Sequence, residues 1–317
     1  MKKILVTRKL IKASEDYASS IFDAKLNSND ILLTTDELIV KSNDCDGILS
    51  ALTEKIDANV IKKLSSKVKI ISNFAVGFGN IDIVAARKKN IVVTNTPDVL
   101  TDATAEIAML ILLGAARRAK EGIEWANKKG WKWSADFLMG KQLTGSRLGI
   151  LGMGRIGRAV ADKARSFGMI IHYHNRSKLD KSLEKNAVYH NSLKSLFSVS
   201  DFFSINCPAT KETKHIINKE TLKYFPDGAV LSNSARGDMI DDDAMVSSLK
   251  SGKIFSLGLD VYNGEPNIHP EYLKLPNVFA LPHLGSSTVT TRTAMGNLAV
   301  SNLEEFLKTG KCKNTVT

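Results

Sequence analysis

The sharpest chemical pattern in this sequence is a glycine series with the spacing G-x-G-x-x-G, at Gly152, Met153, Gly154, Arg155, Ile156 and Gly157. An apolar, strand-like run at 147–151 precedes it, a helix-like stretch at 155–167 follows, and a second β-rich run at 169–173 comes next. In this context the first glycine permits a tight turn, the second lets the backbone approach a pyrophosphate, and the third lets the helix pack closely on the strand. The N–H groups at the start of the helix would then bind the phosphates. The pattern predicts a dinucleotide site, and the alternative is a glycine-rich turn that binds nothing.

The residues after the second strand indicate which dinucleotide binds. An NAD site usually has an acidic residue there for the ribose 2′-hydroxyl, whereas this sequence has His-Asn-Arg-Ser-Lys at 174–178. Arg176 and Ser177 can bind a 2′-phosphate, and Asn175 is a further candidate ligand. NADP, as NADPH, is therefore favoured over NAD. The alternative is that Arg176 stacks on the adenine or points into solvent.

A nicotinamide dinucleotide gives a hydride to an acceptor, and an acceptor such as a 2-oxo acid would need donors for its carboxylate, a group that polarises its carbonyl, and an acid that ionises near neutral pH. Among the six histidines, His283 directly follows a predicted strand at 278–281, and ligands bind at such strand ends in parallel α/β proteins. A lone histidine is more often structural, so His283 needs partners to count as catalytic.

Two charged residues are candidate partners. Arg236 follows a predicted strand at 229–233 and can hold a carboxylate through two parallel hydrogen bonds, although a surface arginine is an open alternative. Glu265 can orient His283 and hold its proton, whereas on spacing alone a simple turn residue is the commoner explanation.

The elements that must position these residues alternate along the chain. Strands are predicted at 3–7, 30–33, 47–50, 68–72, 91–94, 147–151, 169–173, 201–206, 229–233, 256–260 and 278–281. Helices are predicted at 57–64, 81–89 with Asn80 as N-cap, 101–121, 155–167 and 288–307. This alternation predicts an α/β fold with two doubly wound parallel sheets.

Length and composition limit the class of protein. A chain of 317 residues predicts two domains, and its 43% hydrophobic and 24% charged residues are typical of a globular protein. Because no run of eighteen apolar residues occurs, we expect no membrane span. The three cysteines form no CxxC pair, which predicts a reducing, cytoplasmic compartment and no metal site. The net charge of +11 comes from scattered lysines, so we expect no nucleic-acid partner but an attraction for anionic ligands.

Together these motifs resemble the D-isomer-specific 2-hydroxyacid dehydrogenases over nearly the whole chain. The resemblance is carried by the glycine turn and by the segments 73–82, 96–101, 206–208, 234–237, 258–261, 264–266 and 282–285. It implies that Arg236, Glu265 and His283 are catalytic and that Val76, Gly77 and Arg236 bind the substrate. The further cofactor residues that it implies are Cys207, Pro208, Ser234, Ala235 and Asp260. In the family, the match to Asp260 meets the nicotinamide amide, and the match to Cys207-Pro208 forms a wall near the adenosine.

The resemblance also implies an architecture and an activity. Residues 1–100 and 285–317 would form a flavodoxin-like substrate domain, residues 101–284 a Rossmann cofactor domain, and the arm at 131–139 the contact of a homodimer. Segments 96–106 and 174–178 are most similar to the glyoxylate/hydroxypyruvate reductase branch. The expected activity is NAD(P)H-dependent reduction of glyoxylate or hydroxypyruvate to the 2-hydroxy acid, with His283 as general acid. The alternatives are a phosphoglycerate or D-lactate dehydrogenase, and a non-catalytic, dinucleotide-sensing corepressor with the same fold.

Overall fold

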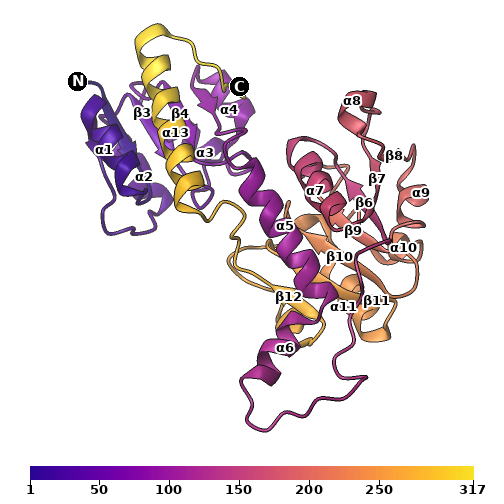
Figure 1. Cartoon of the computed structure of the whole chain (residues 1–317). Coiled ribbons are helices and arrows are strands. Elements are labelled where there is room, and N and C mark those ends of the chain that lie inside the picture. Colours follow the sequence, from indigo (N-terminus) through magenta and orange to yellow (C-terminus); the bar gives the residue numbers. More distant parts are fainter. The chain divides into compact units, whose positions relative to one another are not determined.

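The computed structural model describes all residues, 1–317, and the chain divides into two compact units. The first unit contains Met1–Leu100 and Ser286–Thr317, and the second contains Thr101–Gly285. Each unit is built on one fully parallel sheet covered by helices (Figure 1). The predicted fold class, two doubly wound parallel-sheet units, is therefore confirmed. None of the helices combines the length and the apolar character needed to cross a membrane.

The sheet of the first unit has the strand order β2-β1-β3-β4-β5, which is the flavodoxin-like order. Its strands are β1 (Lys3–Val6), β2 (Asp23–Lys25), β3 (Gly47–Ser50), β4 (Ile70–Asn73) and β5 (Val92–Thr94). Its helices are α1 (Lys12–Ile21), α2 (Thr35–Ser42), α3 (Ala58–Lys63), α4 (Ile83–Lys88) and α13 (Val289–Thr309). All residues of the central strands β3 and β4 are buried, as expected for a sheet with helices on both faces.

The C-terminal segment completes the first unit. Helix α13 lies beside α1 (Figure 1), and its Ala299 and Leu303 are buried in the same apolar cluster as Ile4 of β1. After α13, the N–H of Val316 donates to the carbonyl of Val93 at 2.9 Å. The last residues of the chain therefore contact the end of β5, more than 200 residues earlier in the sequence.

The sheet of the second unit has the strand order β12-β11-β10-β9-β6-β7-β8, which is the Rossmann order with a seventh strand added. Its strands are β6 (Arg147–Leu151), β7 (Ile170–His174), β8 (Val188–Tyr189), β9 (Phe202–Ile205), β10 (Ala229–Asn233), β11 (Ile254–Leu259) and β12 (Val278–Ala280). Its α-helices are α5 (Thr101–Ala116), α6 (Ala119–Ala126), α7 (Arg155–Ser166), α8 (Lys181–Glu184), α9 (Leu193–Phe197), α10 (Lys219–Leu222), α11 (Asp242–Ser251) and α12 (Pro270–Lys274). A 3-10 turn, η1 (Gly237–Met239), follows β10.

Three details of the predicted secondary structure are wrong. Residues 30–33 form no strand, because Asp30 has a left-handed backbone and its carboxylate is held by Arg8, while Ile31 is 59% exposed. The second strand of the chain is instead β2. The predicted N-cap of α4 is also wrong, because Asp82 caps that helix by accepting from the N–H of Ala85.

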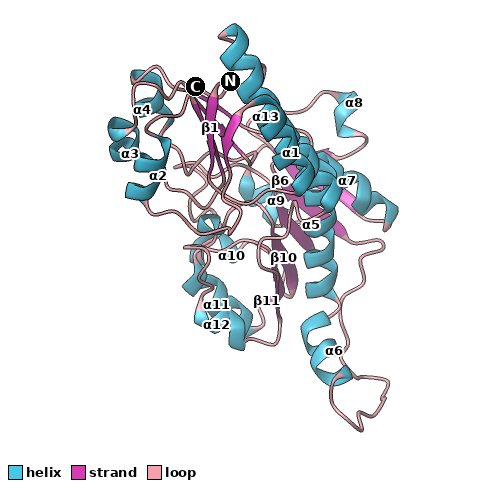
Figure 2. Cartoon of the chain, turned by 90° about the vertical axis from the view of Figure 1, so that its left-hand side faces the viewer, coloured by secondary structure: helices cyan, strands magenta, loops and turns pink.

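The third error concerns the long helix predicted at 101–121. It is two helices, because Arg118 has a φ of 54° that ends α5, and its guanidinium is bound by Glu121 in the first turn of α6. Figure 2 shows α6 and the loop after it projecting from the rest of the second unit. The predicted arm at 131–139 lies in this loop.

Candidate active site

The glycine turn joins β6 to α7, and glycine has a different structural role at each of its three positions. Gly152 has a φ of +91°, and a Cβ there would lie 2.6 Å from the Cα of Cys207. A Cβ on Gly157 would lie 2.2 Å from the carbonyl oxygen of Gly152, so this glycine lets the helix pack on the turn. A Cβ on Gly154 would meet nothing within 4 Å. The space in front of Gly154 is therefore open, whereas the other two positions are closed by the protein itself.

This turn fits a dinucleotide pyrophosphate. Gly154 is the N-cap of α7 and has no side chain with which to cap it, so the positive end of a twelve-residue helix is available to an anion. The side chain of Asn175, at the end of β7, accepts a hydrogen bond from the N–H of Met153 at 2.6 Å. Asn175 thus holds the turn in place, and Arg155 and Ile156 form the first turn of the helix beyond it.

The segment after β7 is exposed and basic. Arg176, Ser177 and Lys178 are all exposed, and Lys178 lies 3.9 Å from the carboxylate of Glu184. The Thr210 hydroxyl and, more weakly, the nearby charge of Arg176 hold the pKa of Glu212 below its usual value. The guanidinium of Arg176 is thus near the loop that follows β9, the strand whose end carries Cys207 and Pro208.

Arg236 follows β10 in a tightly packed loop. The N–H of Ala235 donates to the side chain of Asn233 at 3.0 Å, and the side chain of Asn233 donates to the carbonyl of Arg236 at 2.7 Å. A Cβ on Gly237 would lie 1.9 Å from the carbonyl carbon of Tyr262, so this loop lies directly against the loop that follows β11. Ser234 and Ala235 are half-buried in the same loop. Burial lowers the pKa of Arg236, while the charge of Glu265 opposes that effect.

His283 and Glu265 form a hydrogen-bonded pair. The Nδ1 of His283 lies 2.7 Å from one carboxylate oxygen of Glu265, and each side chain is 34% exposed. The other oxygen of Glu265 accepts a hydrogen bond from the N–H of Tyr262 at 2.9 Å. Because the carboxylate engages Nδ1, the Nε2 of His283 is the nitrogen left to face a ligand.

The charge state of Glu265 follows from its surroundings. Burial alone would raise the pKa of Glu265, but the hydrogen bond and charge of His283, the N–H of Tyr262 and the charge of Arg236 together lower it below its usual value. Glu265 therefore stays ionised through the neutral pH range.

Two buried residues hold this pair in place. The carboxylate of Asp260, which is 1% exposed, accepts hydrogen bonds from the N–H groups of Leu284 at 2.7 Å and Gly285 at 2.9 Å. These bonds stabilise the turn in which His283 adopts a φ of 57°, a conformation that costs a non-glycine residue about 1–3 kcal/mol. Tyr262 donates its hydroxyl to the carbonyl of Leu281 at 2.6 Å and so links the loop of Glu265 to the loop of His283.

The sequence did not single out Tyr262. A tyrosine three residues after the end of a buried strand is the signal that would have found it, because its ring fills space while its hydroxyl needs a partner. The prediction for Asp260, contact with the nicotinamide amide, stays a prediction.

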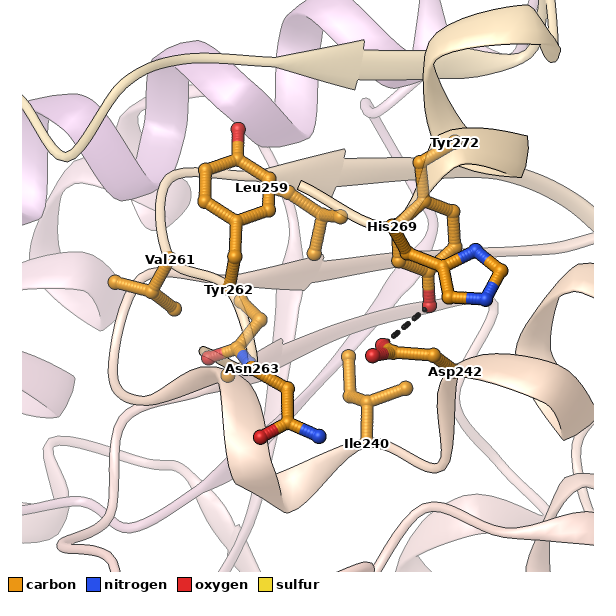
Figure 3. Close-up of a pocket in the computed structure, with 10 residues that line it drawn as sticks. Ile240, Asp242, Leu259, Val261, Tyr262, Asn263, His269 and Tyr272 are labelled. Atoms are coloured by element: carbon orange, nitrogen blue, oxygen red, sulfur yellow. Dashed lines mark hydrogen bonds between the residues drawn. The ribbon is translucent and has the colours of Figure 1, made fainter. Parts of the chain in front are cut away.

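A narrow hollow without room for a water molecule is lined by residues of the loops after β10 and β11, among them Gly237, Tyr262 and Asn263 (Figure 3). Asp242 and Tyr272 face each other across it, and the hydroxyl of Tyr272 donates to Asp242 at 2.9 Å. Burial raises the pKa of Asp242 and of Tyr272. This hollow is a packed support for the two loops and not a ligand site.

The other predicted substrate residues belong to the first unit. Val76 and Gly77 lie between β4 and α4, and neither N–H donates to an acceptor in the chain. Two adjacent, unoccupied backbone donors are suited to a carboxylate. The structure thus brings Arg236, Glu265 and His283 together in the second unit, and it places the two backbone donors in the first.

A glycine turn at the positive end of a helix, on a Rossmann sheet that also carries an acid–base pair, defines a dinucleotide-dependent oxidoreductase of the α/β class. Comparison with known proteins supports this class. Residues 109–285 match the model of the D-isomer specific 2-hydroxyacid dehydrogenase NAD binding domain. Glycerate dehydrogenase of Hyphomicrobium methylovorum is 42% identical over 94% of this chain and 94% of its own length. Glyoxylate reductase of Thermococcus onnurineus is 38% identical over 99% of this chain and 95% of its own.

Solved structures agree with these relatives. A protein of Polaromonas sp. JS6 66, assigned to the D-isomer specific 2-hydroxyacid dehydrogenases, aligns with a TM-score of 0.94 and 42% identity over 100% of both chains. The NADPH-dependent glyoxylate/hydroxypyruvate reductase of Sinorhizobium meliloti, in complex with NADP and malonate, aligns with a TM-score of 0.88 and 31% identity over 100% of this chain and 97% of its own.

The chain belongs to the D-isomer specific 2-hydroxyacid dehydrogenase family. It is an oxidoreductase of 2-hydroxy and 2-oxo acids with a nicotinamide dinucleotide cofactor.

Substitution of Gly154 tests the open approach to the pyrophosphate. Gly154→Ala adds a methyl group that clashes with nothing in the protein but occupies the space for the phosphates. We expect an unchanged melting temperature and a cofactor Kd raised by about tenfold or more, measured by fluorescence titration. Gly152→Ala is the matched variant: its added Cβ would strike Cys207, so it should lower the melting temperature. Wild-type cofactor affinity in Gly154→Ala would show that the pyrophosphate binds elsewhere.

Proposed function

We propose that this protein reduces a small 2-oxo acid, glyoxylate or hydroxypyruvate, to its 2-hydroxy acid with NADPH. The observation that carries the proposal is the 2.7 Å contact between His283 and Glu265, which supplies an oriented acid on the same sheet as the glycine turn. The relatives named glyoxylate reductase and glycerate dehydrogenase support a substrate of this size.

Different groups of the protein bind the substrate. The N–H groups of Val76 and Gly77 donate to the substrate carboxylate, because they have no acceptor in the chain. Arg236 also binds the substrate through its charge and polarises the ketone. Its loop holds the guanidinium side chain half-buried, which strengthens a charge-assisted hydrogen bond.

The proton comes from His283. When bound, the reduced nicotinamide supplies a hydride to the carbonyl carbon. His283 gives the proton on its Nε2 to the carbonyl oxygen, and its Nδ1 stays hydrogen-bonded to Glu265. The hydrogen bond to Glu265 fixes the ring plane of His283 during the transfer. Asp260 and Tyr262 keep the two loops at the distance that this hydrogen bond requires.

The cofactor preference rests on Arg176 and Ser177. Both are exposed after β7, and residues 174–178 contain no carboxylate that would repel a 2′-phosphate. The NADP complex of the Sinorhizobium meliloti reductase supports the same choice.

Two further assignments belong to this proposal. The first is a homodimer in which the loop after α6 contacts the partner. The exposed large side chains of Trp131, Trp133 and Met139 support it, because such apolar patches mark interaction sites.

The second is a reducing, cytoplasmic compartment, in which Cys45, Cys207 and Cys312 stay free thiols.

A substrate screen tests the proposed function. Oxidation of NADPH and of NADH is followed at 340 nm with glyoxylate, hydroxypyruvate, pyruvate, phenylpyruvate and phosphohydroxypyruvate. We expect the highest kcat/KM with NADPH and one of the first two acids. A best rate with phosphohydroxypyruvate or pyruvate would indicate a phosphoglycerate or lactate dehydrogenase instead. No turnover with any acid, despite NADPH binding, would indicate a dinucleotide sensor.

Removal of one guanidinium tests the cofactor preference. Arg176→Ala should lower kcat/KM for NADPH by about tenfold and leave that for NADH nearly unchanged, because only the 2′-phosphate loses a charge-assisted hydrogen bond. Lys178→Ala removes the same charge two residues away, beside Glu184, and should have the smaller effect. A wild-type enzyme that prefers NADH, or equal effects of the two variants, would contradict the role of Arg176.

Variants of the pair test the acid. His283→Ala should lower kcat by about 10²–10⁴, the usual contribution of a positioned acid. Glu265→Gln keeps the shape of the side chain and removes its charge, so it should lower kcat, although by less than His283→Ala, and leave the KM for NADPH unchanged. The kcat values are compared where an isotope effect with deuterated NADPH shows that hydride transfer limits the rate. Near-wild-type turnover in His283→Ala would exclude His283 as the acid, and wild-type turnover in Glu265→Gln would exclude the coupling.

A further inference from the structure

Hydrogen bonds within the first unit hold the carbonyl groups, but not the N–H groups, of the backbone between β4 and α4. The carbonyls of three consecutive residues, Ala75, Val76 and Gly77, each accept a hydrogen bond from within the first unit. The N–H groups of the five residues 76–80 donate to nothing in the chain. The carbonyls of residues 75–77 are thus held by the first unit, whereas the N–H groups of residues 76–80 are available to a ligand.

Two asparagine side chains supply two of the three donors. Asn95, after β5, donates to the carbonyl of Val76 at 2.8 Å, and Asn73, at the end of β4, donates to the carbonyl of Gly77 at 2.9 Å. The third donor is the N–H of Thr96, which binds the carbonyl of Ala75 at 2.8 Å.

Planarity of the peptide links these bonds to substrate recognition. The carbonyl of one residue and the N–H of the next belong to one rigid plane and point in opposite directions. A bond that holds the carbonyl of Val76 therefore sets the direction of the N–H of Gly77. In the same way, the bond from Thr96 to Ala75 sets the direction of the N–H of Val76.

Asn95 is itself held by the C-terminal segment. Asn302 of α13, which is 2% exposed, donates to the carbonyl of Asn95 at 3.0 Å. The side chain of Asn314 donates to the side-chain oxygen of Asn302 at 2.9 Å, and the carbonyl of Asn314 accepts the N–H of Asn95 at 3.2 Å. A chain of hydrogen bonds thus runs from residues 302 and 314, through Asn95, to Val76.

Asn73 has an equivalent support from the strand next to β4. The hydroxyl of Ser50 donates to the side-chain oxygen of Asn73 at 3.1 Å, and Asn73 also donates to Asn80 at 3.2 Å. Asn80 in turn donates to the carbonyls of Ala51 at 2.9 Å and Glu54 at 3.1 Å. Both asparagines that hold the segment are therefore fixed by further polar groups, and Asn73 is fully buried.

We propose that Asn95, fixed by Asn302 and Asn314, is a positioning residue for the substrate carboxylate, and that the C-terminal segment thereby sets the affinity for the 2-oxo acid. The inference rests on the proposed function, in which Val76 and Gly77 bind that carboxylate. Asn73 has the same role toward the N–H of Phe78. None of these asparagines touches the reacting atoms; they act through the direction of backbone donors.

The test compares Asn95→Ala and Asn314→Ala with the wild type and with Asn59→Ala. Asn59 is an exposed residue of α3 whose side chain makes no hydrogen bond, and it serves as the matched control. Asn95→Ala should raise the KM for glyoxylate and the inhibition constant of oxalate by the same factor, about tenfold, because one hydrogen bond per bound carboxylate is misdirected. The KM for NADPH should stay unchanged and kcat should stay within about twofold. Asn314→Ala should show the same pattern with a smaller factor, and Asn59→Ala none of it.

A merely structural role gives a different result. Loss of folded protein lowers the amount of active enzyme, so kcat would fall at unchanged KM and unchanged oxalate inhibition, and that result would overturn the proposal. Calorimetric titration of each protein with oxalate, at saturating NADP, separates this inference from the proposed function. If the wild type reduces no 2-oxo acid, the proposed function fails, while weaker oxalate binding in Asn95→Ala than in the wild type still supports the positioning role. Equal oxalate binding in the two proteins, or binding by neither, would overturn it.

Discussion

The hydrogen bond between His283 and Glu265 is the interaction on which the arrangement of the charged residues in the second unit depends. Its two partners come from loops after β11 and β12, which are neighbouring parallel strands. Parallel strands end at the same edge of a sheet, so the fold brings the loops near each other. Proximity of the loops alone does not fix a 2.7 Å contact, and three buried residues supply the further constraints. Asp260 binds the turn of His283, Tyr262 joins the two loops, and the absence of a side chain on Gly237 lets the Arg236 loop pack against them.

The same arrangement explains the ionisation of the site. Glu265 is half-buried, which by itself would favour its neutral form, yet His283, Arg236 and the N–H of Tyr262 keep its pKa low. Asp260 shows the opposite balance, because burial raises its pKa although the N–H groups of Leu284 and Gly285 oppose this. The two carboxylates therefore differ: Glu265 stays ionised in its hydrogen bond with His283, and Asp260 holds the backbone of Leu284 and Gly285.

In the first unit, the proposed binding of the substrate carboxylate depends on the direction of backbone donors. Val76 and Gly77 present N–H groups whose orientation is set by the carbonyls on the other side of the same peptides. The donors that hold those carbonyls come from the ends of β4 and β5, and Asn302 and Asn314 extend the network to the C-terminal segment. Residues 286–317 are therefore held in the first unit by this network in addition to their apolar packing on Ile4 and Ile70.

The sequence by itself determined the fold class, most strands to within one or two residues, and the glycine turn, because alternating apolar runs and glycine spacing are local properties. It also indicated Arg236, Glu265 and His283 as a set, through several motifs in a characteristic order. It failed where a local pattern was overruled: residues 30–33 are apolar but held as a loop by Arg8, and Arg118 divides what looked like one helix. Only the tertiary structure decided the roles of Tyr262, Asn73, Asn95 and Asn302. Their partners lie 4 to 207 residues away in the sequence and are mostly backbone carbonyls, which every residue has and no sequence pattern can mark.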